Sequence, residues 1–150
     1  MIKLTFTVRP GQGEPSGFDL GDLVCEGEGG TAASTGHVPD QGMMIHLSVP
    51  LLLDQLEPLL SGKRRTLTYT PIGSSYRLDF HRRRDGHVRV RANGIPVGRC
   101  STEDLARAVL TAAQSFADEH VETLPAGDPA AKDYTSALRR FRQAQHDPTT

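Results

Sequence analysis

The sequence predicts a single α+β domain over residues 1–150, with an antiparallel sheet and helices packed on one of its faces. Apolar and polar residues alternate through several short segments, which is the period of a strand with one buried face. Two segments after residue 100 instead repeat apolar residues every three or four positions, which is the period of an amphipathic helix. A chain of 150 residues suits one domain and is long enough to bury a core.

The N-terminal part of the chain predicts two strands and a long loop. The first strand ends at Pro10, and residues 20–26 form the second. Residues 27–42 are rich in glycine and contain nothing that would chelate or catalyse, so we predict a mobile loop there. The residues that alternate with polar ones in the first strand are Ile2, Leu4, Phe6 and Val8.

The next segment predicts a short strand over residues 43–49 and a helix over residues 50–61. Ser48 suits the cap of this helix, because its side chain can accept from a free backbone N–H. Pro50 then falls in the first turn, where its missing N–H costs little, and Gly62 ends the helix. The apolar stripe of this helix consists of Leu52, Leu53, Leu56, Leu59 and Leu60.

Residues 64–100 predict a four-stranded meander whose register follows from its turns. A two-residue turn at Asp85-Gly86 would place the apolar residues of the two flanking strands on opposite faces. A three-residue loop over 84–86 pairs Phe80 with Val90 and puts both apolar sets on one face, so we predict this loop.

The other turns of the meander are predicted in the same way. Asn93-Gly94 is a strong signal for a two-residue hairpin and pairs Ala92 with Ile95. Pro96 cannot donate to a ladder, so its strand is expected at a sheet edge. In the first hairpin we expect Leu67 and Tyr69 opposite Leu78 and Tyr76. The predicted inner face consists of Tyr76, Leu78, Phe80, Val88, Val90, Ala92, Ile95 and Val97.

Two helices are expected after the meander, over residues 102–120 and 129–145. Ser101 to Asp104 resembles a capping box, with an aspartate in place of the usual glutamate. Asp128 and Pro129 offer a cap and a first-turn proline for the last helix. We expect the tail at 146–150 to fray.

Positive charge is concentrated in the meander, although the whole chain has a formal net charge of −1. Clustered charge can steer a charged partner even when a molecule is nearly neutral. Two interpretations stay open, a solvated face or a surface for an acidic protein, and we expect Asp79 to neutralise Arg91. The candidate partner-binding residues on the outer face are Arg77, His81, Arg83, His87, Arg89 and Arg91.

Two alternative functions use the same face. Nucleic acid could follow the arginines, but the aromatic residues Tyr69, Tyr76 and Phe80 are predicted on the opposite face, away from them. A small enzyme would require a pocket that joins His81 or His87 to a second titratable group.

The sequence offers no catalytic motif, no cofactor site and no metal-ligand spacing. Cys25 and Cys100 lack CxxC spacing and fit a reducing compartment, and a single disulfide between them stays open. No signal peptide and no membrane-spanning segment is visible, so we expect a cytoplasmic protein that does not engage a membrane. The sequence does not indicate the oligomeric state.

The order of elements over residues 43–117 resembles small actinobacterial proteins of unknown function and the WapI-type immunity proteins that neutralise polymorphic toxins. The resemblance rests on the leucine-rich segment 51–60, the hairpin RRDGHVRVR, and the motif STEDL that opens an alanine-rich helix. It transfers no functional residue to this chain. It implies a non-catalytic bacterial protein that binds one partner through its surface.

Overall fold

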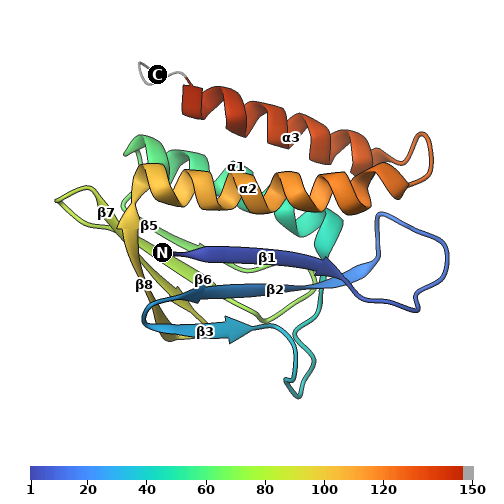
Figure 1. Ribbon diagram of the computed structural model, residues 1–150, viewed down its shortest axis with the longest axis horizontal. Coiled ribbons are helices and arrows are strands. Elements are labelled where there is room, and N and C mark those ends of the chain that lie inside the picture. Colours follow the sequence, from blue (N-terminus) through green and yellow to red (C-terminus); the bar gives the residue numbers. More distant parts are fainter. Residues whose placement is uncertain (147–150) are drawn as a thin grey trace.

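The structure is a computed structural model that describes residues 1–146, and in it two antiparallel sheets lie beneath three helices (Figure 1). The order of strands is β1-β2-β3 in the first sheet, where β4 also pairs with β2, and β5-β6-β7-β8 in the second. This arrangement confirms the predicted α+β class. Among residues 1–146, no helix is long and apolar enough to cross a membrane. The strands are β1 (Lys3–Val8), β2 (Leu20–Gly27), β3 (Gly30–Ala33), β4 (Met43–Met44), β5 (Thr66–Tyr69), β6 (Leu78–Arg82), β7 (His87–Ala92) and β8 (Ile95–Ser101). The helices are α1 (Ile45–Ser61), α2 (Thr102–His120) and α3 (Pro129–His146), with a 3₁₀ turn at Val121–Thr123.

Helix α1 begins five residues earlier than the sequence predicted, so most of the expected strand over 43–49 is helical. The buried stripe continues backward through Val49 to Ile45 at helical spacing, which favours a helix over a strand. Ser48 therefore does not cap the helix, and its hydroxyl donates to the carbonyl of Met44 at 2.8 Å.

The segment predicted as a mobile loop over 27–42 contains β3, which pairs antiparallel with β2. Beyond β3, Ser34 Oγ accepts from Leu23 N–H at 3.0 Å, and Asp40 binds the guanidinium of Arg9. These contacts attach the segment to the first sheet. The composition of the segment gave no sign of them, because they depend on partners distant in the sequence.

The second sheet confirms the predicted register of its central hairpin, since Phe80 lies opposite Val90. Arg83 N–H donates to His87 O at 2.7 Å, and Gly86 has a φ of 85°, as the three-residue loop requires. The first hairpin keeps the predicted faces but is shifted by two residues, with Leu67 opposite Phe80 rather than Leu78. A shift of two preserves which side chains point inward.

The prediction that Ile95 belongs to the core is wrong, because Ile95 is 42% exposed although it lies opposite Ala92 as predicted. Beyond this pair, β8 contains a bulge. The register shifts between Val90 and Arg91, so that Val90 lies opposite Gly98. The extra residue lets Val97 and Cys100 both point inward although they are three residues apart. Strand β8 is the edge of its sheet, as Pro96 predicted.

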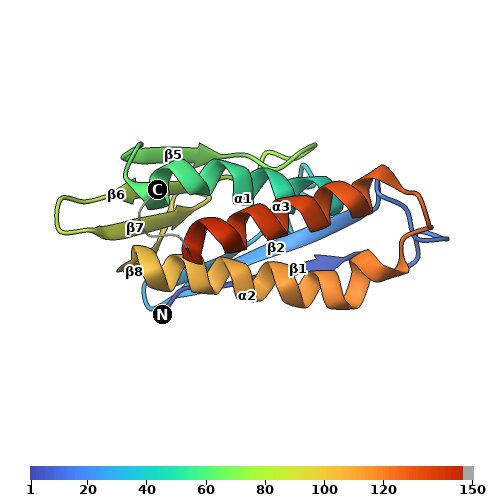
Figure 2. The same ribbon diagram turned by 90° about the horizontal axis from the view of Figure 1, so that it is seen from above.

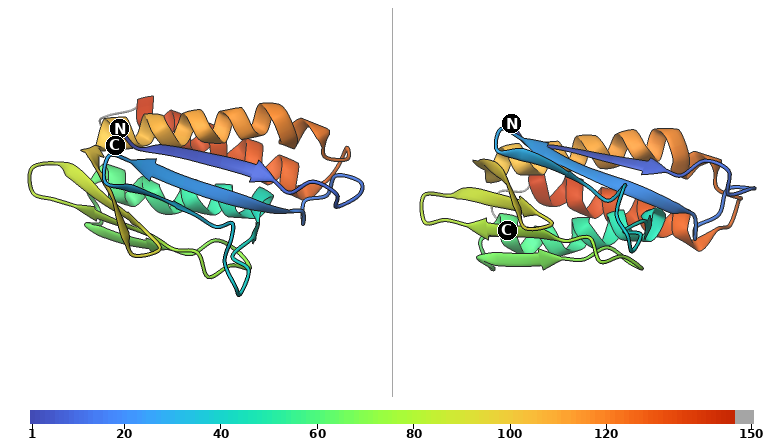
Figure 3. Two further views of the ribbon diagram at one scale, coloured as in Figure 1. Left: turned by 60° about the horizontal axis from the view of Figure 1, so that its bottom comes forward. Right: turned by 90° about the horizontal axis from the view of Figure 1, so that it is seen from below.

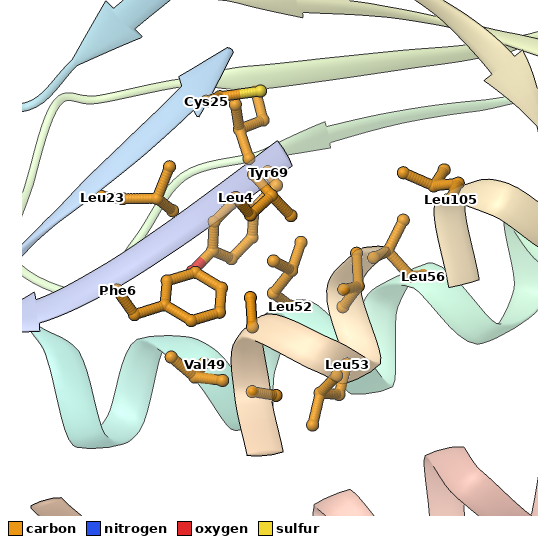
Figure 4. Packing of buried hydrophobic residues seen from close by; sticks show 14 of the residues in the cluster. Leu4, Phe6, Leu23, Cys25, Val49, Leu52, Leu53, Leu56, Tyr69 and Leu105 are labelled. Atoms are coloured by element: carbon orange, nitrogen blue, oxygen red, sulfur yellow. The ribbon is translucent and has the colours of Figure 1, made fainter. Parts of the chain in front are cut away.

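The core lies between the two sheets and the helices. Figure 4 shows Leu4, Phe6, Leu23 and Cys25 of the first sheet packed toward α1 and α2. The two sheets meet where the β2–β3 turn approaches β8, and Gly29 N–H donates to Val97 O at 2.7 Å. A Cβ at Gly29 would lie 2.8 Å from Pro96 O, so this approach requires glycine.

The two later helices occupy their predicted positions. Ser101 caps α2 by accepting from Asp104 N–H at 3.0 Å, as the capping-box motif predicted. Helix α3 lies over α1 and α2 as an outer layer and packs on them rather than on a sheet (Figure 2). The predicted fraying of the tail falls, from residue 147 onward, outside the described residues.

Candidate functional site

One face of the second sheet points away from the helices (Figure 3). We call it the outer face, and the side chains predicted to bind a partner lie there. Strand alternation places one set of residues in the core and the other in solvent, because successive side chains point to opposite faces. The six predicted residues are all exposed, namely Arg77, His81, Arg83, His87, Arg89 and Arg91.

Three basic side chains form a row across this face. His81 lies opposite Arg89 on β7, and Arg89 lies opposite Arg99 on β8. We name His81, Arg89 and Arg99 the basic row. Neighbouring strands are about 4.8 Å apart, so the row spans roughly 10 Å.

The basic row lies in a groove of about 650 Å³ on the outer face. Threonine hydroxyls from β5 stand at one end of the groove, and the β2–β3 turn and β8 stand at the other. The groove thus combines positive charge with hydroxyl donors in a concave surface. The groove is also lined by Gly29, Thr66, Thr68, Asp79, Arg91, Pro96 and Gly98.

Among residues 1–146, Asp79 is the one carboxylate that lines the groove, and it is already engaged. Asp79 accepts from Arg77 Nε at 2.8 Å and from Thr68 Oγ1 at 2.8 Å. The expected neutralisation of Arg91 by Asp79 is therefore wrong, although the two residues do lie opposite each other. Arg91 instead donates through Nη2 to the carbonyl of Gly94 at 2.7 Å. Within residues 1–146, no carboxylate lies within 4 Å of a charged group of the basic row.

Two of the predicted residues, Arg83 and His87, lie beyond the groove at the hairpin end of the sheet. His87 Nδ1 is 3.6 Å from Asp85 Oδ1, and Asp85 also accepts from the His87 N–H at 2.9 Å. This backbone hydrogen bond lowers the pKa of Asp85. Asp85 thus accompanies His87 at this end of the face, whereas among residues 1–146 no carboxylate lies within 4 Å of the Arg83 guanidinium.

Arg99 lies in the groove but was not among the residues predicted from the sequence. A regular ladder from the Asn93-Gly94 turn would pair Arg99 with Val88 and turn it inward. The bulge pairs Cys100 with Val88 and turns Arg99 outward, opposite Arg89. Proline and glycine within one strand, here Pro96 and Gly98, are the signal that could have indicated this bulge.

Other chemistry-bearing groups are placed differently. Cys25 and Cys100 are buried free thiols, and burial raises the pKa of Cys25 to about 12 and that of Cys100 to about 11. Both therefore stay protonated near neutral pH and are poor nucleophiles. In the part of the chain that the structure describes, no three His, Cys, Asp or Glu side chains are grouped as a metal site.

Comparisons of the chain with protein-family models, with curated proteins and with solved structures found no match.

Proposed function

We propose that the protein is a non-catalytic protein-binding module that receives an acidic segment of a partner protein in the groove of its outer face. The observation that carries this proposal is the basic row. Arg89 and Arg99 are directly opposite each other, and like charges at opposed positions of a sheet destabilise it. A carboxylate placed over the row would remove that repulsion.

The side chains of the groove suit carboxylates. Arginine presents a planar fork that binds a carboxylate through two hydrogen bonds. Arg89 and Arg99 are exposed, and the hydroxyl of Thr66 lies in the same groove as a further donor. A row of about 10 Å can contact two acidic side chains seven residues apart on a helix, which rises about 1.5 Å per residue.

The placement of aromatic side chains favours a protein partner over nucleic acid. Proteins that bind single strands stack bases on exposed aromatic rings. Tyr69, Tyr76 and Phe80 are buried beneath the sheet, with exposed fractions of 0%, 0% and 2%. The basic row would hold a phosphate backbone only by charge. The resemblance to immunity proteins extends the proposal to a toxin domain as the acidic partner.

The proposal is tested by affinity capture from the native lysate, with and without nuclease, followed by mass spectrometry. The variant reverses two charges of the basic row, as Arg89→Glu with Arg99→Glu. The control makes the same change of net charge on α3, as Lys132→Glu with Arg139→Glu, where both residues are exposed.

We expect one acidic protein to be captured by the parent chain and the α3 control, to be lost with the double reversal, and to survive nuclease. Equal capture by all three proteins would contradict the assignment of the surface. Capture that disappears after nuclease treatment would instead support the nucleic-acid alternative.

A further inference from the structure

Strand β1 is an edge of the first sheet, and its outer side is unpaired. Arg9 N–H donates to Leu20 O. Because hydrogen-bonded positions alternate along an antiparallel strand, the backbone N–H and C=O of residues 3, 5 and 7 also point toward β2. The backbone N–H and C=O of Leu4 and Phe6 consequently point away from β2. Among residues 1–146, no hydrogen bond to these groups is found outside the ladder.

A groove of about 880 Å³ runs along this free edge and is bounded on its other side by α2. Figure 1 shows α2 lying along β1. The helix contributes positions three and four residues apart, including Thr111, Ser115 and Glu119, so one side of α2 follows the strand. The apolar floor consists of Ile2, Leu4, Phe6, Ala108, Ala112 and Phe116.

Edges of sheets are usually protected by proline, by bulges or by covering elements. Strand β1 has no proline between residues 3 and 8, and its pairing with β2 is regular. Lys3 is exposed on this strand, and α2 lies beside the strand across the groove. An accessible ladder beside an apolar groove is the geometry by which an extended peptide adds a strand to a sheet.

We propose that this edge groove binds an extended peptide that carries apolar side chains at alternate positions and basic residues between them. Its backbone would bond to Leu4 and Phe6, and its apolar side chains would enter the groove. This site is separate from the basic row and does not depend on the function proposed for it.

The charged residues that line the edge groove favour a basic peptide. Four carboxylates line the groove, from Glu26, Glu28, Asp104 and Glu119, against Lys3, Arg107 and the amino group of Met1. The Met1 amino group is 3.4 Å from Glu28 Oε1. Arg107 is already paired with Asp104 at 3.2 Å. The side of α2 that faces the groove is polar at Thr111 and Ser115. If a second copy of the protein packed its own α2 there, it would need an apolar helix face. A single peptide strand has no such requirement, so it suits this groove better.

The probe is an acetylated heptapeptide amide with lysine and valine alternating and lysine at both ends. We expect it to slow hydrogen exchange of the Leu4 and Phe6 amides at least tenfold, because both would gain an acceptor. A peptide of the same sequence, N-methylated at the residues that face β1, should not protect them. A peptide with glutamate in place of lysine should bind at least tenfold more weakly.

The matched variants place a large side chain in the groove or away from it. Ser115→Trp on α2 should weaken binding of the lysine peptide at least tenfold, whereas Thr135→Trp on α3 should leave it unchanged, since both positions are exposed. Equal binding by the N-methylated peptide, or by Ser115→Trp, would overturn the proposal. The proposal would also be overturned, in favour of a second copy as the occupant, by a dimer of the free protein. In that dimer the Leu4 amide would already be protected from hydrogen exchange, and Ser115→Trp would dissociate it.

Discussion

Arg89 on β7 lies directly opposite Arg99 on β8, and within residues 1–146 neither guanidinium has a carboxylate within 4 Å. The bulge in β8, opposite Val90 and Arg91, creates this pairing because it turns Arg99 to the outer face. Two like charges thus face one another in a groove that also contains His81. This relationship is the basis of the proposed function and of the first prediction.

Replacing Arg99 by threonine should stabilise the free protein. The change removes a like-charge pair and keeps a residue that favours strands, so the free energy of unfolding should rise by up to about 1 kcal/mol. Urea unfolding at low and high salt measures it, and salt should shrink the gain because the pair is exposed. Arg139→Thr on α3 controls for a lost charge. A destabilised Arg99→Thr protein would show that Arg99 has favourable partners in the fold.

Arg9 should be essential for attaching the segment after β3. Its guanidinium donates to Asp22 Oδ2 at 2.8 Å and to Asp40 Oδ2 at 2.7 Å, and Asp22 is buried. Arg9→Met would leave the Asp22 carboxylate with Ser34 as its remaining side-chain donor. We expect a loss of about 2 kcal/mol in the free energy of unfolding, the cost of removing hydrogen bonds to a buried charge.

The control for this prediction is Lys3→Met, because Lys3 is an exposed basic residue of the same sheet. Hydrogen exchange distinguishes local from global effects. Arg9→Met should accelerate exchange of the Gly42 amide, which donates to Asp40 Oδ1 at 2.9 Å in the parent protein. Unchanged exchange at Gly42 would show that the segment is held without Arg9.

Stability should decrease as the pH falls below about 6.5. Burial lowers the pKa of His46 below its ordinary value of 6.5, His120 adds to this effect, and Asp19 and Asp128 oppose it. The unfolded chain therefore binds a proton that the folded chain does not, so the free energy of unfolding falls with decreasing pH by at most about 1.4 kcal/mol per unit.

Urea titrations between pH 8 and pH 5 test this contribution. His46→Leu should flatten the pH dependence over that range, because it replaces a buried imidazole whose Nδ1 has no hydrogen-bond partner within the described chain. His37→Gln, on an exposed segment, is the control. An unchanged slope in His46→Leu would assign the pH dependence to another group.

The cap of α2 should be worth about 1 kcal/mol. Ser101 Oγ accepts from Asp104 N–H, and Ser101→Ala would leave that donor without its partner. Thr102→Ala, one residue further on, is the matched control. Thermal or urea unfolding measures both variants, and an equal loss in the two would contradict a specific role for the Ser101 hydroxyl.

Local rules predicted those parts of the fold that local contacts determine. The three-residue loop at 84–86 followed from the need to place Phe80 and Val90 on one face, and α2 followed from its cap and its stripe. The start of α1 was mispredicted because Pro50 suggested a first turn, whereas burial of Ile45 and Val49 extends the helix past it. A helix interior tolerates proline where tertiary packing compensates for the lost hydrogen bond.

The candidate site could be predicted only in part. Alternation identified the outer face, and four of the six predicted residues, His81, His87, Arg89 and Arg91, lie on strands there. The basic row, however, depends on which residues pair between strands. Arg99 lies in the basic row because of one bulged residue. Asp79 forms its salt bridge with Arg77 rather than with Arg91. Such choices depend on three-dimensional distances that the spacing of residues along the chain does not encode.

The most direct test of the central claim is an NMR titration of the isotope-labelled protein with an acidic peptide, hexaglutamate, at low salt. We predict that the largest shifts of backbone amides occur on β6, β7 and β8 around His81, Arg89 and Arg99, and that they vanish in the Arg89→Glu, Arg99→Glu protein. Shifts that centre on α3 or on another basic surface, or that persist after the double reversal, would contradict it.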